Sequence, residues 1–376
     1  MRAPLEIESG AQEPPGAAGS SGPASGAGSE PRDRKAEHIR LALEPRMQLG
    51  ADPFAGYELE HCALPEIDFD AIDTSVTFLG KRLAAPLLIS CMTGGTESAG
   101  RINRHLAEGA EAAGVAVGVG SQRKALEDPA QAASFRVRDA APTVPLLANL
   151  GAVQLNYGMG LDHCRRAVDM IAADALALHL NPLQEALQPE GDRNFAGLLA
   201  KMAEVARALP VPVIAKEIGC GLSGEVGRRL VEAGIRILDT AGTGGTSWAR
   251  IEAARAGDAE IGELFAGWGV PTADSIRQLR ALDEIGGPAG EPASEGITVI
   301  GSGGLRSGVD VAKAIALGAD LAGLAYPFLA AATESAERVA ERVRRIVHEL
   351  KICMFCIGVQ SIPELRTARL LKRSRP

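Results

Sequence analysis

The segment "DALALHLNPLQEALQPEG" at residues 174–191 joins an apolar run to a polar end. Its first half is apolar almost throughout, which is typical of a parallel strand buried on both faces. The run ends in His179 and Asn181, and Gln184 and Glu185 follow directly. Imidazole, amide and carboxylate groups are costly to bury without partners. A strand that ends in all of them predicts a functional site at its carboxyl end.

Seven more segments repeat this design along the chain. Apolar runs begin at residues 85, 114, 144, 211, 235, 297 and 321. Most runs lie roughly 25–37 residues apart, the length of one strand plus one helix, and helices are expected between them, for example at 195–209 and 308–319. Eight such units in about 250 residues predict an α/β fold, a (β/α)8 TIM barrel. A doubly wound sheet is the alternative, but no G-x-G-x-x-G opens the first unit.

The barrel is expected to span residues 85–330 of a single catalytic domain, residues 31–376. Residues 31–84 precede it as an N-terminal extension, and residues 331–376 are expected to form closing helices. Residues 1–30 are rich in Gly, Ala, Ser and Pro and predict a disordered low-complexity tail. The longest gap lies between the sixth and seventh runs, where residues 246–282 suggest a long active-site loop followed by a helix.

Composition limits the kinds of binding partner and the cellular compartment that can be expected for this protein. The net charge of −8 and the pI near 5.4 give no argument for a nucleic acid or an anionic membrane as partner. The sequence shows neither a membrane span nor a signal peptide, which predicts a cytoplasmic protein. Six cysteines show no framework spacing. Cys353 and Cys356 form an isolated C-x-x-C, for which packed thiols in a helix are favoured over a metal or redox pair.

A phosphate site is predicted where the seventh run ends. "GSGGLRSG" at residues 301–308 follows that run and opens a helix. Glycines let backbone N–H groups approach an anion, and the loops after strands seven and eight often bind phosphate in TIM barrels. The glycine-rich ends "TAGTGGT" and "MTGGT" are expected to face the same mouth.

The remaining strand ends suggest a flat cofactor and a second anion. Lys216 stands inside a barrel strand, where a lysine is expensive unless an anion or a π-system meets it, so it could stabilise negative charge on a flavin ring. Ser121 and Asn149 could bond ring carbonyls and nitrogens. A second anion site is suggested by Arg123 together with the basic segment at residues 33–40, for which an ordinary charged helix face is the alternative.

Glu185 could hold Mg²⁺ at such an anion site, because Mg²⁺ often binds through one or two carboxylates plus substrate phosphates. No dense Asp/Glu cluster in the sequence suggests a metal cage made of protein ligands alone.

Eight motifs, taken together and in order, resemble a known family: "RKAEHI", "MTGGT", "GVGSQR", "NLGAVQL", "HLNPLQEALQPEG", "KEIGCGLS", "GTGGTSW" and "GSGGLRSG". They resemble the type 2 isopentenyl-diphosphate isomerases, which are FMN-dependent TIM-barrel enzymes, from about residue 32 to about residue 366. The resemblance implies that isopentenyl and dimethylallyl diphosphate interconvert by an allylic proton shift on reduced FMN. It also implies Mg²⁺, NADPH as reductant, a role in isoprenoid biosynthesis, and a homo-oligomer (tetramer or octamer).

The resemblance also implies roles for single residues. Gln184 would position the reacting carbons or relay a proton, Lys216 would face the flavin, His179 and Asn181 would complete the catalytic pocket, and Glu185 would bind Mg²⁺. The diphosphate-binding positions are Arg34, Lys35, His38, Arg123 and Gln184. The FMN environment comprises Met92, Thr93, Gly94, Ser121, Asn149, Lys216, Thr246, Gly301, Gly303, Gly304, Arg306, Ala325 and Tyr326. At Tyr326 many relatives carry Arg or another polar residue, so this chain departs from them there.

Three other functions compete with this interpretation. A flavin-dependent 2-hydroxy-acid oxidase would need a histidine base near the sixth and seventh strands, and "DTAGTGGTSWAR" contains none. An enzyme like inosine-monophosphate dehydrogenase would need a nucleophilic cysteine after the sixth strand, where none stands. A flavin-binding barrel without activity would have no need of Gln184, Glu185 and Lys216 together.

Overall fold

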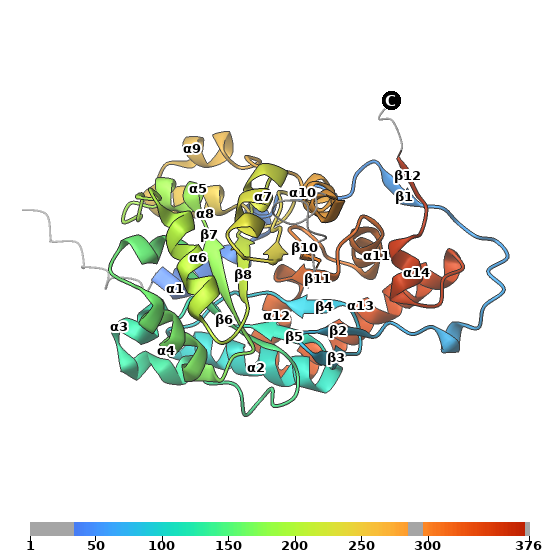
Figure 1. Ribbon diagram of the computed structural model, residues 1–376, viewed down its shortest axis with the longest axis horizontal. Helices are drawn as coiled ribbons and strands as arrows, with labels where there is room; N and C mark the ends of the chain where they lie inside the picture. The colour runs from blue at the N-terminus through green and yellow to red at the C-terminus, as the bar shows by residue number, and fades with distance from the viewer. Residues whose placement is uncertain (1–33, 285–295, 373–376) are drawn as a thin grey trace, which may run out of the picture. The chain divides into compact units, whose positions relative to one another are not determined.

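Eight parallel strands form a closed barrel, seen here in a computed structural model that describes residues 34–284 and 296–372 (Figure 1). Around the barrel the strands follow the order β10-β11-β4-β5-β6-β7-β8-β9. Each predicted apolar run contains one of them, so the TIM-barrel prediction is confirmed. The strands are β4 (Leu87–Ile89), β5 (Ala116–Gly118), β6 (Leu146–Gly151), β7 (Ala175–Leu180), β8 (Val213–Glu217), β9 (Ile237–Asp239), β10 (Thr298–Ser302) and β11 (Leu321–Leu324).

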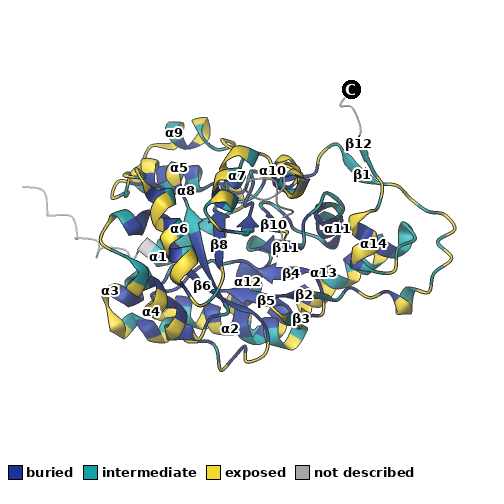
Figure 2. Cartoon of the chain, viewed as in Figure 1, coloured by how far each residue is buried: buried dark blue, intermediate teal, exposed yellow. Residues whose placement is uncertain are grey.

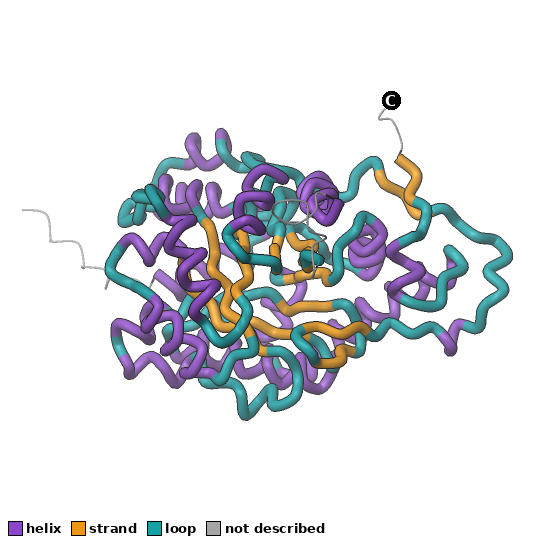
Figure 3. The backbone as a smooth tube through the Cα atoms, in the orientation of Figure 1, coloured by secondary structure: helices purple, strands orange, loops and turns teal. Residues whose placement is uncertain are grey.

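Helices surround the strands (Figure 3). Several begin at a serine or threonine whose hydroxyl accepts a backbone N–H of the first turn, as Thr96 does for α2 and Ser307 for α11. The helices around and after the strands are α2 (Glu97–Ala113), α3 (Arg123–Glu127), α4 (Leu161–Ile171), α5 (Pro182–Leu187), α6 (Leu198–Ala208), α7 (Gly224–Glu232), α8 (Trp248–Ala256), α9 (Ala259–Leu264), α10 (Thr272–Arg280), α11 (Gly308–Ala316), α12 (Tyr326–Glu334), α13 (Ala336–Cys356) and α14 (Ile362–Arg366).

The segment between β9 and β10 is not the long loop that the sequence suggested. It contains α8 and α9 before the expected helix, α10. Ser247 caps α8 by accepting the N–H of Arg250, and Gly257, with φ of 76°, ends the helix in the left-handed conformation. Alanine-rich sequence between these two signals favours a helix. The loop expectation was therefore wrong, and the correction places a helix beside the end of the barrel.

The barrel interior changes from apolar to polar along the strands. Alternate residues of one strand share one face, and the inner face carries a tight apolar layer: Leu88, Ala116, Leu147, Ala175, Ala177, Ile214, Ile300 and Leu321. Phe78 and Leu83 of the hairpin β2 (Val76–Phe78) and β3 (Lys81–Leu83) join the same cluster. Two residues further along, the inward positions hold Asn149, His179, Lys216 and Ser302. Burial of these strands is visible in Figure 2.

The C-terminal helices pack on the outside of the barrel, with α13 lying along α2. Gly109 of α2 permits a close approach, because a Cβ there would stand 2.6 Å from Cβ of Val339. Cys353 and Cys356 lie in the last turn of α13 as free thiols, and burial raises the pKa of Cys353 to about 11. Such a thiol is unreactive, which agrees with the packing interpretation.

The residues before the barrel form α1 (Arg34–Ala42), the 3-10 turns η1 (Pro45–Met47) and η2 (Phe69–Ala71), strand β1 (Tyr57–Leu59) and the β2–β3 hairpin. Strand β1 pairs antiparallel with β12 (Leu370–Lys372), so part of the N-terminal extension meets the C-terminal end of the described chain. The predicted tail, residues 1–30, lies outside the described residues. Within the described ranges, no helix has the length and apolar character needed to cross a bilayer.

Candidate functional site

A cavity of about 250 Å³ opens at the carboxyl ends of the barrel strands. TIM barrels place their sites at this end. Most residues that the sequence singled out line it: Lys35, His38, Met92, Thr93, Ser121, Arg123, Asn149, His179, Asn181, Gln184, Glu185, Lys216, Thr246, Gly303, Gly304, Arg306, Ala325 and Tyr326.

Two of the predicted site residues stand apart from this lining. A Cβ on Gly94 would meet the ring of Phe135, and one on Gly301 would meet Ile276 of α10, so both glycines face packed side chains. Neither lines the cavity. Arg34 is the first residue of α1, and its side chain lies outside the described part of the chain.

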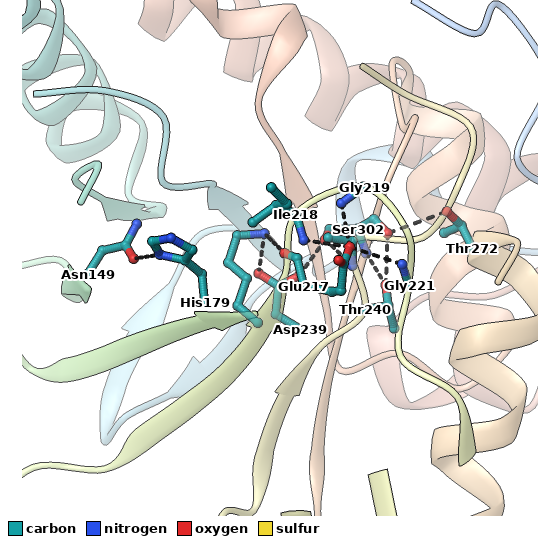
Figure 4. A network of polar contacts seen from close by, with 12 residues as sticks. Asn149, His179, Glu217, Ile218, Gly219, Gly221, Asp239, Thr240, Thr272 and Ser302 are labelled. Atoms are coloured by element: carbon teal, nitrogen blue, oxygen red, sulfur yellow. Dashed lines mark hydrogen bonds and ion pairs between the residues drawn. The ribbon is translucent and has the colours of Figure 1, made fainter. Parts of the chain in front are cut away.

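Lys216 reaches the cavity from β8 and is held from behind. Its Nζ lies 3.2 Å from Oδ2 of Asp239 on β9 and donates to the Glu217 carbonyl at 3.0 Å. The hydroxyl of Ser302 on β10 donates to the other oxygen of Asp239 (Figure 4). Lys216 is 8% exposed and Asp239 only 1%. The charged pair is therefore compensated within the protein, and the lysine presents its ammonium group to the cavity.

His179 stands beside Lys216 on the neighbouring strand, and the two residues are register partners. Its Nδ1 lies 2.9 Å from Oδ1 of Asn149 on β6 (Figure 4). Burial, together with the charges of Lys35, Lys216 and Arg123, lowers the pKa of His179 to about 3. The ring is neutral at pH 7. Because Nδ2 of Asn149 donates to the Val119 carbonyl at 3.2 Å, its Oδ1 faces the ring and accepts from Nδ1–H. His179 therefore adds a hydrogen-bonding group to the site and no positive charge.

The segment that opened the sequence analysis forms a tight polar cluster at the end of β7. The Asn181 amide donates to Oε1 of Gln184 at 3.0 Å and to Oε1 of Glu185 at 2.7 Å. The other Glu185 oxygen accepts the N–H of Asp192 at 2.7 Å. Both ends of the Gln184 amide are engaged, because its Nε2 donates to Glu252 at 2.7 Å. The cluster therefore holds the Gln184 amide in one orientation beside the cavity.

Arg123 stands on the same side of the cavity. It pairs with Asp192 at 3.0 Å, and Gln154 donates to the same carboxylate oxygen at 2.8 Å. A guanidinium that is 28% exposed and held in place suits a bidentate contact with a phosphate. Lys35 and His38 reach the cavity from α1, so the two predicted anion-binding segments meet in space.

The opposite wall of the cavity consists of backbone. Gly303 (φ 111°) and Gly304 (φ 83°) adopt conformations that favour glycine. A Cβ on Gly303 would lie 2.1 Å from the Gly242 carbonyl oxygen, and one on Gly304 would lie 2.5 Å from the Gly244 carbonyl carbon. Two glycine-rich strand ends therefore touch each other at backbone distance. The α11 helix begins at Gly308, but its first N–H groups donate to Asp310 and Glu349, so this wall offers the glycine backbone alone.

The residues present fit an FMN group. The hydroxyls of Ser90 and Thr93 are buried, line the cavity and have no hydrogen-bond partner among the described residues. Buried hydroxyls are normally bonded, so these two point to a polar ligand. The glycine wall suits its phosphate and Lys216 its ring. For Mg²⁺, Glu185 offers a single carboxylate at the cavity, and no group of three His, Cys, Asp or Glu within residues 34–284 and 296–372 could hold a metal.

The chain is similar over nearly its whole length to curated relatives. It is 50% identical over 347 residues to the isopentenyl-diphosphate delta-isomerase of Nostoc sp., covering 91% of this chain and 96% of that relative. It is 51% identical over 338 residues to the isopentenyl-diphosphate delta-isomerase of Paracoccus zeaxanthinifaciens, covering 89% and 95%. The chain belongs to the isopentenyl-diphosphate delta-isomerase family. It is an enzyme of the FMN-dependent type 2 branch, as its motifs suggested.

A model of the FMN-dependent dehydrogenase family matches residues 193–372, which supports FMN as the cofactor of this family member. Among solved structures, a mandelate oxidase with (S)-mandelic acid is similar, with a TM-score of 0.60 and 19% identity over 90% of this chain and 91% of that chain. A Pediococcus acidilactici protein described as a lactate oxidase also has a TM-score of 0.60, with 18% identity over 93% and 89%. At such identity these likenesses show the fold alone.

Glu252 is a site residue of this isomerase-family chain that sequence reasoning missed. It lies on α8 and is fully buried. Although burial opposes its ionisation, contacts from His38, Gln184 and Arg255 hold the pKa of Glu252 below its ordinary value. His38 Nε2 lies 3.1 Å from Oε1, the distance of an ion pair, although off the line of a hydrogen bond. Glu252 thus joins α1 to Gln184. It was missed because the sequence suggested a loop where α8 lies.

Gln48 and Glu217 were also missed. Gln48 donates to Thr246 at 2.9 Å and lies 3.5 Å from Arg306, so the segment after η1 ties two strand ends together. Glu217 accepts N–H groups from residues 218–221 on one oxygen (Figure 4). Burial raises the pKa of Glu217, while those bonds oppose the rise. Their sequence signal is weak, because lone Gln and Glu residues are common on surfaces.

Proposed function

We propose that this chain interconverts isopentenyl diphosphate and dimethylallyl diphosphate by an allylic proton shift that uses reduced FMN and Mg²⁺. The observation that carries the proposal is the pairing of two kinds of group in one cavity. Lys216 and the glycine wall suit a flavin nucleotide, while Gln184, Glu185 and Arg123 suit a diphosphate and a metal ion. A protein that only stored flavin would need the first set alone.

The reaction adds one proton to the terminal alkene carbon and removes another two carbons away, so atoms and electrons balance without net oxidation. Bound in its reduced form, FMN supplies an electron-rich surface beside the developing positive charge and a proton-bearing ring nitrogen. Lys216 favours negative charge on the ring. Arg123, Lys35 and His38 hold the diphosphate, and Glu185 binds Mg²⁺ with it.

Gln184 has a positioning or relay role in this mechanism. An amide is a poor acid and a poor base, so it cannot carry a full proton transfer by itself. Its orientation is set by Asn181 and by Glu252, which leaves one N–H of Nε2 beyond its bond to Glu252. Asn181 maintains this geometry, and His179 completes the pocket from the neighbouring position on β7. Met92, Thr93, Ser121, Asn149, Thr246, Arg306, Ala325 and Tyr326 would surround the cofactor, with Gly94 and Gly301 supporting the backbone near it.

The proposal includes NADPH as the reductant, a homo-oligomer and a cytoplasmic location. The flavin must be reduced before turnover begins, and the proton shift does not consume the electrons. A catalytic amount of reductant is therefore sufficient.

The test is an anaerobic incubation of the purified chain with FMN, NADPH, Mg²⁺ and isopentenyl diphosphate, followed by measurement of dimethylallyl diphosphate. Product is expected with reduced flavin, and no product is expected with oxidised flavin. Flavin binding without product would reject the isomerase proposal. Mandelate and lactate with oxygen should give no hydrogen peroxide, and peroxide formation would favour the 2-hydroxy-acid oxidase instead.

A further inference from the structure

Behind Lys216 lies a buried acidic group that the reaction above does not use. Asp239 is 1% exposed and does not line the cavity. It is the register partner of Lys216 across the β8–β9 pair, so both side chains project into the barrel at the same level. The lysine lines the cavity, and Asp239 lies beside it on the neighbouring strand without lining the cavity itself.

Asp239 is itself held firmly in place. One of its oxygens faces Lys216 Nζ at 3.2 Å, and the other accepts the hydroxyl of Ser302. Ser302 is fixed in turn, because its N–H donates to the Thr240 hydroxyl at 2.8 Å and its Oγ accepts the N–H of Ala241 at 2.9 Å. Figure 4 shows Asp239, Ser302 and Thr240 joined by these contacts. Neither end of the ion pair has freedom to turn away.

We propose that Asp239 is a positioning residue that sets how strongly Lys216 favours the reduced, anionic state of the bound flavin. The inference rests on the FMN cavity proposed above. A buried carboxylate beside the ammonium group holds that group in place, and it also offsets part of the positive potential that Lys216 projects. The pair therefore lets the lysine approach the ring without making the site a strong oxidant.

This tuning suits a reaction without net electron transfer. A lone buried ammonium group would favour an anionic ring strongly and would make that ring less basic. An ion pair would moderate the same field, so that a bound ring would carry negative charge without losing its basicity. The protein adjusts a cofactor through charges placed near its ring atoms.

The first experiment separates the pair from the flavin. Four forms are compared by thermal unfolding without FMN: wild type, Lys216→Met, Asp239→Asn, and the double variant. Each single change leaves one buried charge without its partner, whereas the double variant buries none. The double variant is expected to unfold at a higher temperature than both single variants. A double variant that unfolds at or below the temperature of the more stable single variant would overturn the pairing.

The second experiment measures the midpoint potential of bound FMN by spectroscopic titration. Asp239→Asn keeps an oxygen that can accept from Lys216 but removes the charge, so reduced FMN should bind about tenfold more tightly relative to oxidised FMN. That change equals a rise of about 30 mV for a two-electron couple. Lys216→Met should lower the potential, and Asp239→Asn should raise it less in that background.

The matched control is Asp174→Asn. Asp174 pairs with Lys81 at 2.7 Å at the opposite end of the barrel, just before β7 begins. It should change stability and leave the flavin potential at the wild-type value. An unchanged or lowered potential in Asp239→Asn would overturn the proposal, as would an equal rise with and without Lys216. Failure of wild type to bind FMN would instead reject the proposed function.

Discussion

The two walls of the cavity are built from different groups. On the wall formed by β6 to β8, side chains supply the polar groups, and each is bonded to a neighbour: His179 to Asn149, and Lys216 to Asp239 of β9. On the wall formed by the ends of β9 and β10, glycines supply backbone, and Gly303 and Gly304 touch Gly242 and Gly244. A substitution on the first wall changes charge or hydrogen bonding, whereas a substitution on the second wall introduces a side chain where backbone is already in contact. Substitutions on the two walls should therefore affect different measured properties.

The largest effect is expected on the glycine wall. Gly303→Ala combines a φ of 111° with a Cβ that would lie 2.1 Å from the Gly242 carbonyl oxygen. The loops that carry Gly242 and Gly303 must move apart. The affinity for FMN should therefore fall about a thousandfold, a loss of roughly 4 kcal/mol in binding free energy. Isothermal titration calorimetry with FMN measures this affinity. Gly257→Ala is the control, because that glycine has a φ of 76° with open space around it and lies at the end of α8. Equal affinities in the two variants would remove the distinction between the walls.

On the side-chain wall, Gln184→Asn should leave FMN affinity intact and lower turnover about a hundredfold. The shortened side chain cannot reach both Asn181 and Glu252, so the amide loses its fixed orientation. Steady-state assays with saturating isopentenyl diphosphate measure it. Gln278→Asn also removes one glutamine bond, to Gly224, outside the cavity, and should behave like wild type. Normal turnover in Gln184→Asn would take Gln184 out of the mechanism.

His179 predicts a pH dependence of stability. Its pKa is about 3 in the folded chain and 6.5 in the unfolded chain, so below pH 6.5 the unfolded chain binds the extra proton. The contribution of neutral His179 to the free energy of unfolding is fully present above pH 6.5. It falls by about 1.4 kcal/mol for each pH unit below that value, which makes roughly 2.7 kcal/mol at pH 4.5. Denaturant unfolding at several pH values should show a flatter profile for His179→Gln. His61→Gln, at an exposed position, should keep the wild-type slope. Parallel profiles for wild type and His179→Gln would contradict this assignment.

The smallest effect concerns the metal. Glu185→Gln keeps the shape of the side chain and its bond to the N–H of Asp192 but removes the charge. The Mg²⁺ concentration for half-maximal activity should rise about tenfold, which is the loss expected when one ligand weakens. A Mg²⁺ titration of initial rates measures it, with Glu204→Gln on the exposed face of α6 as control. An unchanged titration would reject Glu185 as a ligand.

The sequence by itself determined the barrel and most of the side-chain wall. A strand buried on both faces leaves a continuous apolar run, and a parallel barrel brings the carboxyl ends of all its strands together, so local pattern placed Asn149, His179 and Lys216. Only the tertiary structure decided the partners. Gln184 meets Glu252 across 68 residues, and Gln48 meets Thr246 across 198. Such contacts form only when the barrel closes and the helices pack against it. They could not be predicted, because local periodicity does not say which distant segments lie next to each other. For the same physical reason the local pattern assigns no role to Asp239, which meets Lys216 only because β8 and β9 lie side by side.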